Sequence, residues 1–407
     1  MVSACAAAGV PVVASGGNTG FCGGSIPDQS GTQVVVALSR MNRIRSIDTG
    51  GDSIALDAGC ILATAREHAA AHGRLLPLSH GGEGSSQIGG NLATNAGGLN
   101  VLRYGMAREL VLGLEVVLAD GRVLDMMRAL RKDNTGYDLK QLFVGSEGTL
   151  GIITGAVLKL FPVPAQRETA LAAIADASKA VQLLAHARST LGARIAAFEL
   201  IPRSGLELVL EFDRSAADPF GRPYPWYVLV EQEGEGLGNA LEAALQAGLI
   251  VDAAVAHSEA QRSALWRMRE NLAVAQVSDR SNLKNDTSVP IMAIPEFIAR
   301  ATAEVQQVAP GARPIPFGHV GDGNIHFNLS RPAEMEPALF IERWPALVAA
   351  VEGVALALGG SISAEHGIGR AKREALVRAR SVTELETMRA LKAALDPRGL
   401  LNPGKLL

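Results

Sequence analysis

The stretch Ser15-Gly-Gly-Asn-Thr-Gly-Phe-Cys-Gly-Gly24 contains five glycines in ten residues and follows a short apolar segment, residues 10–14. Glycine leaves backbone amides accessible, so a loop of this composition after a strand can cradle phosphate groups. A dinucleotide-binding Rossmann unit needs a helix directly after such glycines. Here residues 25–31 have a turn-like composition and residues 34–38 form the next apolar strand, so the sequence disfavours a Rossmann unit.

Two further glycine-rich segments follow, residues 76–98 and residues 144–154. Each is bordered by small hydroxyl or amide side chains, and three such loops can line a long, flat, polar ligand closely. Between the loops, apolar runs predict strands at residues 54–58, 114–118 and 156–160. The pair Asp120-Gly121 predicts a hairpin turn.

A second informative stretch is Phe317-Gly-His-Val-Gly-Asp-Gly-Asn-Ile-His-Phe-Asn328. Its Gly-Asp-Gly-Asn centre is rich in residues that favour turns, and short strands are predicted on either side. Such a hairpin would bring His319 and His326 side by side. His326 and Asn328 are two positions apart on a strand and therefore point to one face.

A third metal ligand is offered by Ser361-Ile-Ser-Ala-Glu-His-Gly-Ile-Gly-Arg370, in which Glu365 and His366 precede two glycines. Two histidines and one carboxylate form a common open metal site that leaves positions free for substrate. The alternative is that these are turn residues and surface histidines. The occurrence of both motifs in the same half of the chain favours the metal site.

Composition limits the function classes. A prior of about 150 residues per domain gives two or three domains for 407 residues. The net charge of −3 argues against nucleic acid and anionic membranes as partners. No apolar run approaches the roughly 18 residues of a membrane span. Three cysteines and the lack of a basic cluster in the first ten residues indicate a cytoplasmic protein without a secretory signal.

The second half of the chain predicts an α+β domain. Residues 161–168 carry two prolines and form the exit from the first domain. Helical apolar spacing is present at residues 171–191 and 259–276, and strands are predicted at residues 195–201, 226–231 and 282–289.

Two basic residues of this second half are candidates for an anion site. Arg269 shares a helix face with Trp266, and Lys284 lies on the strand that follows. A guanidinium and an ammonium directed at one pocket would suit an anionic group. The alternative is that both are solvated surface charges.

The three loops, the hairpin and the ending Asp396-Pro-Arg-Gly-Leu-Leu-Asn-Pro-Gly-Lys405 occur in an order that resembles the vanillyl-alcohol oxidase and p-cresol methylhydroxylase (PCMH) flavoproteins. Within that superfamily the chain is most similar to FAD-linked D-2-hydroxy-acid dehydrogenases, which include D-2-hydroxyglutarate and D-lactate dehydrogenases and the flavin subunit of glycolate oxidase. The resemblance covers essentially the whole chain. It implies oxidation of a D-2-hydroxy acid to the 2-oxo acid.

The same resemblance implies an α+β fold with two domains. Residues 1–163 would form a two-lobed PCMH-type FAD-binding domain, N-terminally shortened because relatives carry further residues before the first lobe. Residues 164–407 would form a cap for substrate and metal, with an antiparallel sheet flanked by helices. Its tail, residues 395–407, would pack back toward the FAD domain.

The cofactor residues follow from the matching motifs. Asn18 stands where some members of the superfamily attach flavin through histidine, so the FAD is expected to be non-covalent. The residues that the resemblance places along the pyrophosphate, the ribityl chain or the flavin are Gly16, Gly17, Asn18, Thr19, Gly20, Gly24, Pro77, Ser85, Gly90, Thr94, Asn95, Glu147, Gly148 and Ile153.

The chemistry of 2-hydroxy-acid oxidation assigns roles to the remaining candidates. A divalent metal, Zn²⁺ with Fe²⁺ or Mn²⁺ as alternatives, would be held by His319, His326 and Glu365 and would bind the substrate hydroxyl and carboxylate. His366 would be the general base, since an imidazole titrates near neutral pH. The substrate would also be held by Asn328, Arg269 and Lys284. Relatives that act on D-2-hydroxyglutarate carry a hydroxyl residue where Ala273 stands, so the five-carbon diacid is only one candidate.

Three alternatives remain open at this point. Electrons could pass to a flavoprotein or quinone acceptor, as in a dehydrogenase, or to oxygen, as in an oxidase. The chain could instead be a non-catalytic FAD-binding subunit. A homodimer is a further expectation.

Overall fold

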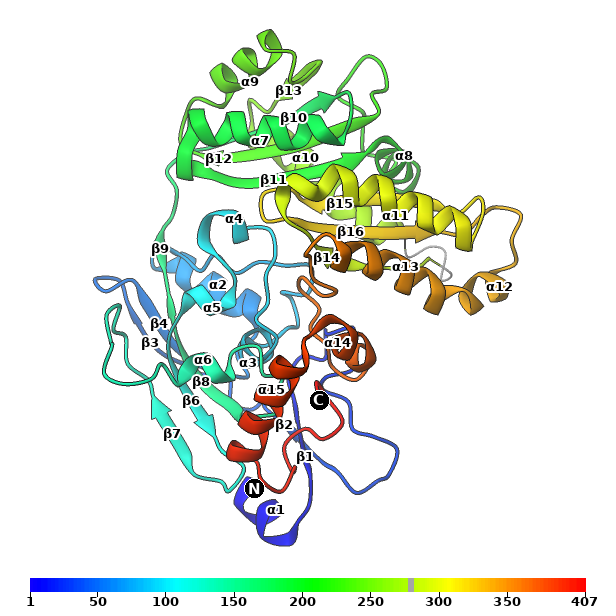
Figure 1. Ribbon diagram of the computed structural model, residues 1–407. Coiled ribbons are helices and arrows are strands. Elements are labelled where there is room, and N and C mark those ends of the chain that lie inside the picture. The colour runs from blue at the N-terminus through cyan, green and yellow to red at the C-terminus, as the bar shows by residue number, and fades with distance from the viewer. Residues whose placement is uncertain (277–281) are drawn as a thin grey trace. The chain divides into compact units, whose positions relative to one another are not determined.

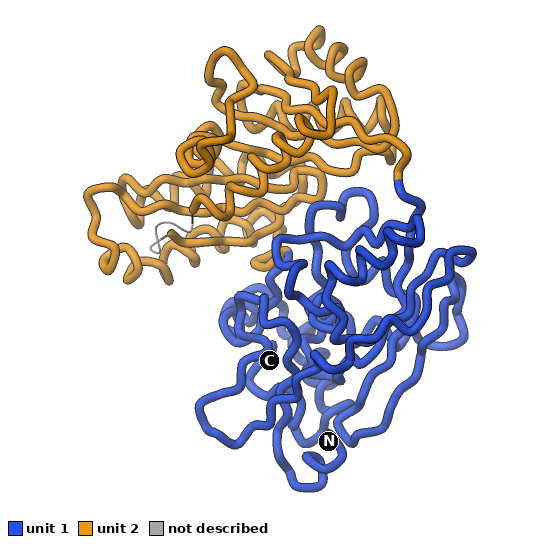
Figure 2. Tube along the Cα trace, turned by 180° about the vertical axis from the view of Figure 1, so that it is seen from behind, with its two compact units in different colours: residues 1–163, 365–407 blue, residues 164–364 orange. Residues whose placement is uncertain are grey.

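A computed structural model describes residues 1–276 and 282–407 (Figure 1). The chain divides into two compact units, coloured separately in Figure 2. Unit 1 comprises residues 1–163 and 365–407, and unit 2 comprises residues 164–364. Within the described residues, no helix combines the length and the apolar character that a membrane-spanning segment requires.

Unit 1 contains a five-stranded antiparallel sheet whose strand order is β3 (Ile44–Asp48), β4 (Ser53–Asp57), β8 (Ile152–Lys159), β6 (Val111–Val117) and β7 (Val123–Met126). A parallel pair is formed by β1 (Val12–Ser15) and β2 (Val34–Ala37), and an antiparallel pair by β5 (Arg74–Leu75) and β9 (Phe161–Pro162). The strands predicted at residues 54–58, 114–118 and 156–160 are confirmed as parts of β4, β6 and β8. The predicted turn at Asp120-Gly121 joins β6 to β7.

The helices of unit 1 are α1 (Val2–Ala8), α2 (Leu62–Ala71), α3 (Ile88–Ala93), α4 (Val101–Tyr104), α5 (Ala107–Leu110), α6 (Lys140–Phe143), α14 (Arg373–Ala379) and α15 (Val382–Leu395). One hydrophobic core joins the sheet to α2 and α3, through fully buried residues such as Ile54, Leu56, Leu62 and Ile88. The sheet is therefore the base on which the loop before α3 is held.

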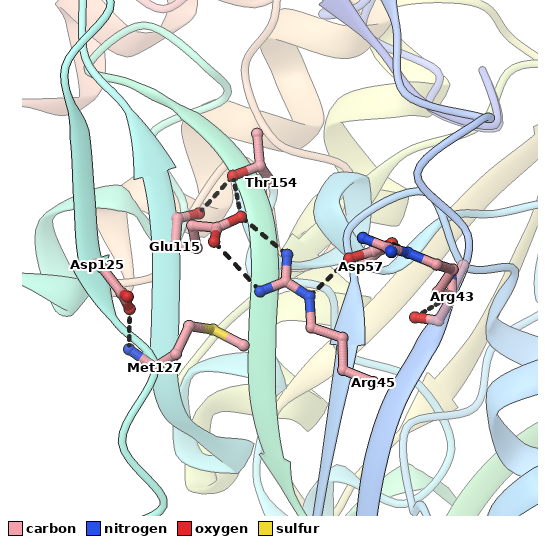
Figure 3. A network of polar contacts seen from close by, with 8 residues as sticks. Arg43, Arg45, Asp57, Glu115, Asp125, Met127 and Thr154 are labelled. Atoms are coloured by element: carbon pink, nitrogen blue, oxygen red, sulfur yellow. Dashed lines mark hydrogen bonds and ion pairs between the residues drawn. The ribbon is translucent and has the colours of Figure 1, made fainter.

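A polar network ties four strands of this sheet together (Figure 3). Arg45 on β3 donates from Nε to Asp57 on β4 at 2.6 Å and from both Nη atoms to Glu115 on β6. Thr154 on β8 donates to Glu115 at 2.9 Å. Gly155 leaves the space that Arg45 occupies, since a Cβ there would lie 2.7 Å from its guanidinium.

Residues 365–407 belong to unit 1. The sequence prediction instead assigned residues 164–407 to the cap and expected only its tail, residues 395–407, to pack back toward the FAD domain. The reason is a set of hydrogen bonds that begins before residue 395. Glu147 accepts from the backbone amides of Ile368 at 2.7 Å and Gly369 at 2.6 Å. Asn402 donates from Nδ2 to the carbonyl oxygen of Glu147 at 2.7 Å, and Lys392 donates to that of Thr149 at 2.7 Å.

Unit 2 is built on a seven-stranded, fully antiparallel sheet. Its strand order is β13 (Asp252–Val255), β10 (Arg167–Ile174), β12 (Trp226–Glu233), β11 (Ile195–Pro202), β15 (Arg313–His319), β16 (Asn324–Ser330) and β14 (Asp286–Ser288). The hairpin predicted around residues 317–328 is confirmed as β15 and β16.

Helices cover both faces of this sheet (Figure 1). They are α7 (Ala177–Leu191), α8 (Arg203–Phe212), α9 (Leu237–Gln246), α10 (Glu259–Ala275), α11 (Ile294–Val308), α12 (Pro337–Glu342) and α13 (Trp344–Ala357), with short 3-10 turns at Gly192–Arg194 and Ile291–Ala293. Helices α8 and α10 pack on the face that carries Ile315 and Phe317. On the opposite face, the ring of Phe297 in α11 lies 5.6 Å from that of Phe327.

Two sequence expectations in unit 2 need correction. The helix predicted from residue 171 begins at Ala177, and the preceding residues form β10. Residues 169–174 are all buried, and a short, continuous apolar run fits a buried strand as well as a helix. Asp176, which caps α7 by accepting from the amides of Ser178 and Lys179, was the available signal. The strand predicted at residues 282–289 is limited to Asp286–Ser288 with a single bridge from Leu283 to Leu329.

Candidate active site

Unit 1 contains a pocket at which the three glycine-rich segments meet. Its walls come from the loop after β1, from α3 with the residues that flank it, and from the turn before β8. Of the residues predicted to hold the cofactor, those lining this pocket are Gly16, Gly17, Asn18, Thr19, Gly20, Gly24, Gly90, Thr94, Glu147, Gly148 and Ile153.

Three predicted cofactor residues are not among the lining residues. The carbonyl oxygen of Pro77 accepts from Asn100, and the amide oxygen of Asn95 accepts from the backbone of Arg108. The carbonyl oxygen of Ser85 lies against Gly17, where a Cβ would come within 2.0 Å of it. All three lie in the glycine-rich segment, residues 76–98, that borders the pocket.

The pocket also has polar lining residues that sequence reasoning missed, among them Gln87 and Asn91. Gln87 is only 8% exposed, and its Oε1 atom has no hydrogen-bond partner among the described residues. A buried amide oxygen without a partner is costly unless a ligand or water satisfies it. Gln87 directly precedes the first turn of α3, and this position next to the glycine-rich segment is the sequence signal that could have identified it as a pocket residue.

The loop geometry fits a flat polar cofactor. Gly17 must lack a side chain because the chain at Ser85 is in contact with it, whereas nothing lies within 4 Å of a Cβ built on Gly20 or Gly90. The loops are therefore packed against each other but open toward the pocket. Asn18 has a positive φ of 54°, held by the hydroxyl of Ser15, which donates to its side chain at 3.0 Å.

Glu147 is the ionisable residue at the centre of these contacts. It is 8% exposed and has a positive φ of 51°. Burial raises the pKa of its carboxyl, although the two amides that donate to it act in the opposite direction. The carboxyl thereby holds residues 367–369 against the pocket loop, within unit 1.

His366, the predicted general base, also lines this pocket. Its ring centroid lies 4.8 Å from that of Phe21, which is 71% exposed. The structure therefore brings His366 to the same pocket as the glycine-rich loops.

In unit 2, His319 and His326 occupy the same face of the β15–β16 hairpin, with ring centroids 5.5 Å apart. Each histidine stands opposite a buried carboxylate on the strand that flanks the hairpin on that side. Glu199 on β11 pairs with His319, and Asp286 on β14 pairs with His326. The Nδ1 atoms lie 2.7 Å from Glu199 and 3.6 Å from Asp286. The hydrogen bond between His319 Nδ1 and Glu199 leaves Nε2 of that ring as the nitrogen available to a metal.

Glu199 contacts Arg269 as well as His319. The Nε atom of Arg269 donates to Oε2 of Glu199 at 2.7 Å, and both side chains are buried. Burial alone would raise the pKa of Glu199, but its contacts with His319 and Arg269 outweigh burial and lower the pKa to about 2. The guanidinium also lies over the ring of Phe317, 5.0 Å from its centroid.

The other predicted substrate residues differ in their environment. Asn328 is buried, accepts from the amide of Asn285 at 3.2 Å and donates to Gln276 at 2.8 Å. Lys284 is exposed. Of the two predicted cations, the structure therefore joins Arg269 to the histidine hairpin through Glu199, and it shows no such link for Lys284 among the described residues.

Glu365 directly follows Ala364, the last residue of unit 2. Within residues 1–276 and 282–407, one group of three or more His, Cys, Asp or Glu side chains could hold a metal ion. It consists of His319, His326 and Glu365, whose candidate ligand atoms all lie within 4.8 Å of one another. Two imidazoles and one carboxylate fit a divalent transition metal.

Two protein families match the chain. Residues 163–406 match the C-terminal domain of the FAD linked oxidases, and residues 1–127 match an FAD binding domain. Among solved structures, p-cresol methylhydroxylase with bound substrate aligns with a TM-score of 0.76 at 15% identity, over 100% of this chain and 85% of that one. Alkyldihydroxyacetonephosphate synthase aligns with a TM-score of 0.73 at 19% identity, over 99% and 74%. These two likenesses show the fold.

The curated relatives are more similar in sequence. D-2-hydroxyglutarate dehydrogenase from Xanthomonas citri pv. viticola is 38% identical over 98% of this chain and 84% of its own length. The mitochondrial D-2-hydroxyglutarate dehydrogenase of Bos taurus is 38% identical over 96% of this chain and 71% of its own length. The chain therefore belongs to the FAD-linked oxidases, in the group that contains the D-2-hydroxyglutarate dehydrogenases.

Proposed function

We propose that this FAD-dependent oxidoreductase oxidises a D-2-hydroxy acid to the 2-oxo acid, with D-2-hydroxyglutarate as the first candidate and D-lactate as the second. The observation that carries the proposal is the set of His319, His326 and Glu365, which can provide three ligands to one metal ion. Its support is the similarity to D-2-hydroxyglutarate dehydrogenases over nearly the whole chain.

The cofactor chemistry defines what the protein must provide. Bound FAD supplies a hydride acceptor, and a divalent metal, Zn²⁺ in our proposal with Fe²⁺ or Mn²⁺ as alternatives, supplies Lewis acidity. The glycine-rich loops around residues 16–20, 90 and 148 hold FAD without a covalent bond. His319, His326 and Glu365 hold the metal.

The remaining roles belong to side chains of the chain itself. His366 takes the proton from the substrate hydroxyl, because a neutral imidazole is the side chain suited to accept a proton near neutral pH. Asn328 binds the carboxylate next to the reacting carbon. Arg269 and Lys284 bind the group at the far end of the substrate, and the fixed guanidinium of Arg269 suits a second carboxylate.

The substrate class is tested by anaerobic flavin reduction. The protein would be reconstituted with FAD and Zn²⁺, and its absorbance recorded while D-2-hydroxyglutarate, D-lactate, D-malate, glycolate and the L-enantiomers are added. The proposal predicts bleaching by a D-acid and none by its L-enantiomer. Equal bleaching by both enantiomers, or by none of the acids, would contradict it.

We further propose that electrons leave through a flavoprotein or quinone acceptor and that the protein acts in the cytoplasm as a homodimer. The chain has only three cysteines, which suits a reducing compartment. Oxygen consumption during turnover separates an oxidase from a dehydrogenase. Turnover that keeps pace with oxygen uptake would contradict the acceptor proposal, and light scattering decides the oligomeric state.

A further inference from the structure

Four adjacent strands of the unit 2 sheet carry a row of ionisable side chains. Along β11, β15, β16 and β14 the row reads Glu199, His319, His326 and Asp286. The order is carboxylate, imidazole, imidazole, carboxylate. Each carboxylate stands directly opposite one histidine in the register of its strand pair.

Both carboxylates are unusual for their surroundings. Glu199 and Asp286 are each 1% exposed. Glu199 is the single charged residue of β11, whose other residues are apolar. Burying a carboxylate in an apolar strand is costly unless the charge is paired and hydrogen-bonded, so this position requires an explanation beyond packing.

The contacts of Glu199 provide that explanation. One oxygen accepts from His319 Nδ1 at 2.7 Å, and the other accepts from Arg269 Nε at 2.7 Å. Both acceptor atoms of one carboxylate are therefore engaged, one by a candidate metal ligand and one by a candidate substrate-binding cation. A neutral amide at this position could accept with only one of its two terminal atoms.

Asp286 differs from Glu199 in its contact with the neighbouring histidine. Its distance of 3.6 Å to His326 Nδ1 exceeds that of a hydrogen bond, and Oδ1 accepts from Asn324 at 2.9 Å. Among the described residues, the ion pair of Arg269 is with Glu199. The two carboxylates thus form a matched pair in which Glu199 reaches the arginine.

We propose that Glu199 is a positioning residue that fixes His319 for metal binding and Arg269 for substrate binding at the same time. The carboxylate keeps the proton of His319 on Nδ1, which leaves the Nε2 lone pair for the metal. It also keeps Nε of Arg269 engaged, so that the two Nη groups are presented as a fork. The role in substrate binding rests on the proposed function, whereas the tautomer of His319 does not.

The first test needs neither metal nor substrate. In the metal-free, ¹⁵N-histidine-labelled protein, the ring-nitrogen shifts of His319 report which nitrogen carries the proton, with assignment by loss of the signal in His319→Gln. The proposal predicts the Nδ1–H form in the wild type and a mixture of the two tautomers in Glu199→Gln. A wild-type ring protonated at Nε2 would overturn the proposal, even if the variant failed to fold.

The second test measures metal and substrate binding in the FAD-loaded protein. Zn²⁺ affinity, determined by competition with a chelator, should fall about 10- to 100-fold in Glu199→Gln. The KM for D-2-hydroxyglutarate should rise more than the KM for D-lactate, because only the former has a second carboxylate for Arg269. Asp286→Asn should lower Zn²⁺ affinity less and leave the ratio of the two KM values unchanged.

Glu231→Gln is the control for loss of a buried carboxylate in the same sheet. Glu231 lies on β12, is 4% exposed and accepts from Thr169, Arg262 and Trp266. It should leave the His319 tautomer and the Zn²⁺ affinity at wild-type values. Equal losses in Glu231→Gln and Glu199→Gln would show a general effect on folding and overturn the proposal. Absence of Zn²⁺ binding and flavin reduction in the wild type would instead refute the proposed function, while the tautomer still decides the role of Glu199.

Discussion

Arg269 is a buried cation whose guanidinium makes two different contacts. Its Nε atom is hydrogen-bonded to Glu199, and its guanidinium plane lies over Phe317. The plane and fork geometry are features that a lysine ammonium lacks. A guanidinium held in this way is oriented before any substrate arrives, which lowers the entropic cost of binding a carboxylate.

We predict that Arg269→Lys weakens the binding of a substrate with a distal carboxylate. The KM for D-2-hydroxyglutarate should rise at least about tenfold, corresponding to about 1.4 kcal/mol of binding free energy. The KM for D-lactate should change less, because it lacks the distal carboxylate. Steady-state kinetics with both acids check the prediction, and equal changes in the two KM values would contradict it.

His366→Ala tests the assignment of the general base. The variant should retain FAD, while the rate of flavin reduction by substrate falls about 10²- to 10⁴-fold. His257→Ala, at an exposed position, is the control and should reduce flavin at the wild-type rate. Stopped-flow absorbance under anaerobic conditions provides the measurement, and an unchanged rate in His366→Ala would refute the role.

Where a motif was present, the sequence alone named residues that lie together in the structure. Gly16 to Gly20, Glu147 and His366 were named from the sequence, and they line one pocket. Glu199, Asp286 and Gln87 were missed because each is a lone polar residue whose partners come from distant strands or helices. A single charge in an otherwise apolar strand, as in β11, is the signal that could have identified Glu199.

At the scale of elements, the sheet of unit 1 carries a pH-sensitive network. Burial would raise the pKa of Asp57, but the hydrogen bonds from Arg45 and Arg43 outweigh burial and lower it. Arg45 also lowers the pKa of Glu115. A carboxyl whose pKa is lower in the folded state stabilises the fold above its unfolded pKa, about 4, and this contribution is lost as the pH falls.

Arg45→Met should therefore destabilise unit 1 at neutral pH by about 1–3 kcal/mol. The loss of stability between about pH 5 and pH 2 should be shallower than in the wild type, because the pKa values of Asp57 and Glu115 would be less depressed. Thermal unfolding across this pH range checks both effects. An acid transition as steep as that of the wild type would show that Arg45 does not control these carboxyls.

The elements that the sequence predicted best are those bounded by turn or capping residues. The hairpin of β15 and β16 was predicted from its Gly-Asp-Gly-Asn turn, and α10, which Ser258 caps in the structure, was predicted from its apolar spacing. The start of α7 was wrong because β10, an inner strand of the sheet, is buried throughout residues 169–174 and has no alternation of polar and apolar residues. Burial by distant elements determines such a segment, and local spacing does not reveal it.

At the scale of the whole molecule, unit 1 is made from both ends of the chain. The segment 365–407 contributes α14, α15 and the loop that holds His366. Asn402 connects this segment to the pocket, since its Nδ2 atom donates to the carbonyl oxygens of Gly24 and Glu147. The C-terminal segment therefore supports the walls of the pocket lined by the glycine-rich loops within unit 1.

Asn402→Ala should destabilise unit 1 by about 1–3 kcal/mol, because the carbonyl oxygens of buried Glu147 and of partly buried Gly24 lose their donor. It should also release FAD more readily than the wild type, which fluorescence of the free flavin would report. Thr387→Ala, an exposed position in α15, is the control within the same segment. Wild-type stability and flavin retention in Asn402→Ala would contradict this account of the C-terminal segment.

The central claim is that a metal held by His319, His326 and Glu365 is required for oxidation of a D-2-hydroxy acid by the bound flavin. The most direct measurement is anaerobic flavin absorbance in metal-depleted, FAD-loaded protein after addition of D-2-hydroxyglutarate, followed by addition of Zn²⁺. The account predicts oxidised flavin until Zn²⁺ is added and bleaching afterwards, with no recovery in His326→Ala. Bleaching at full rate before any metal is added would contradict it.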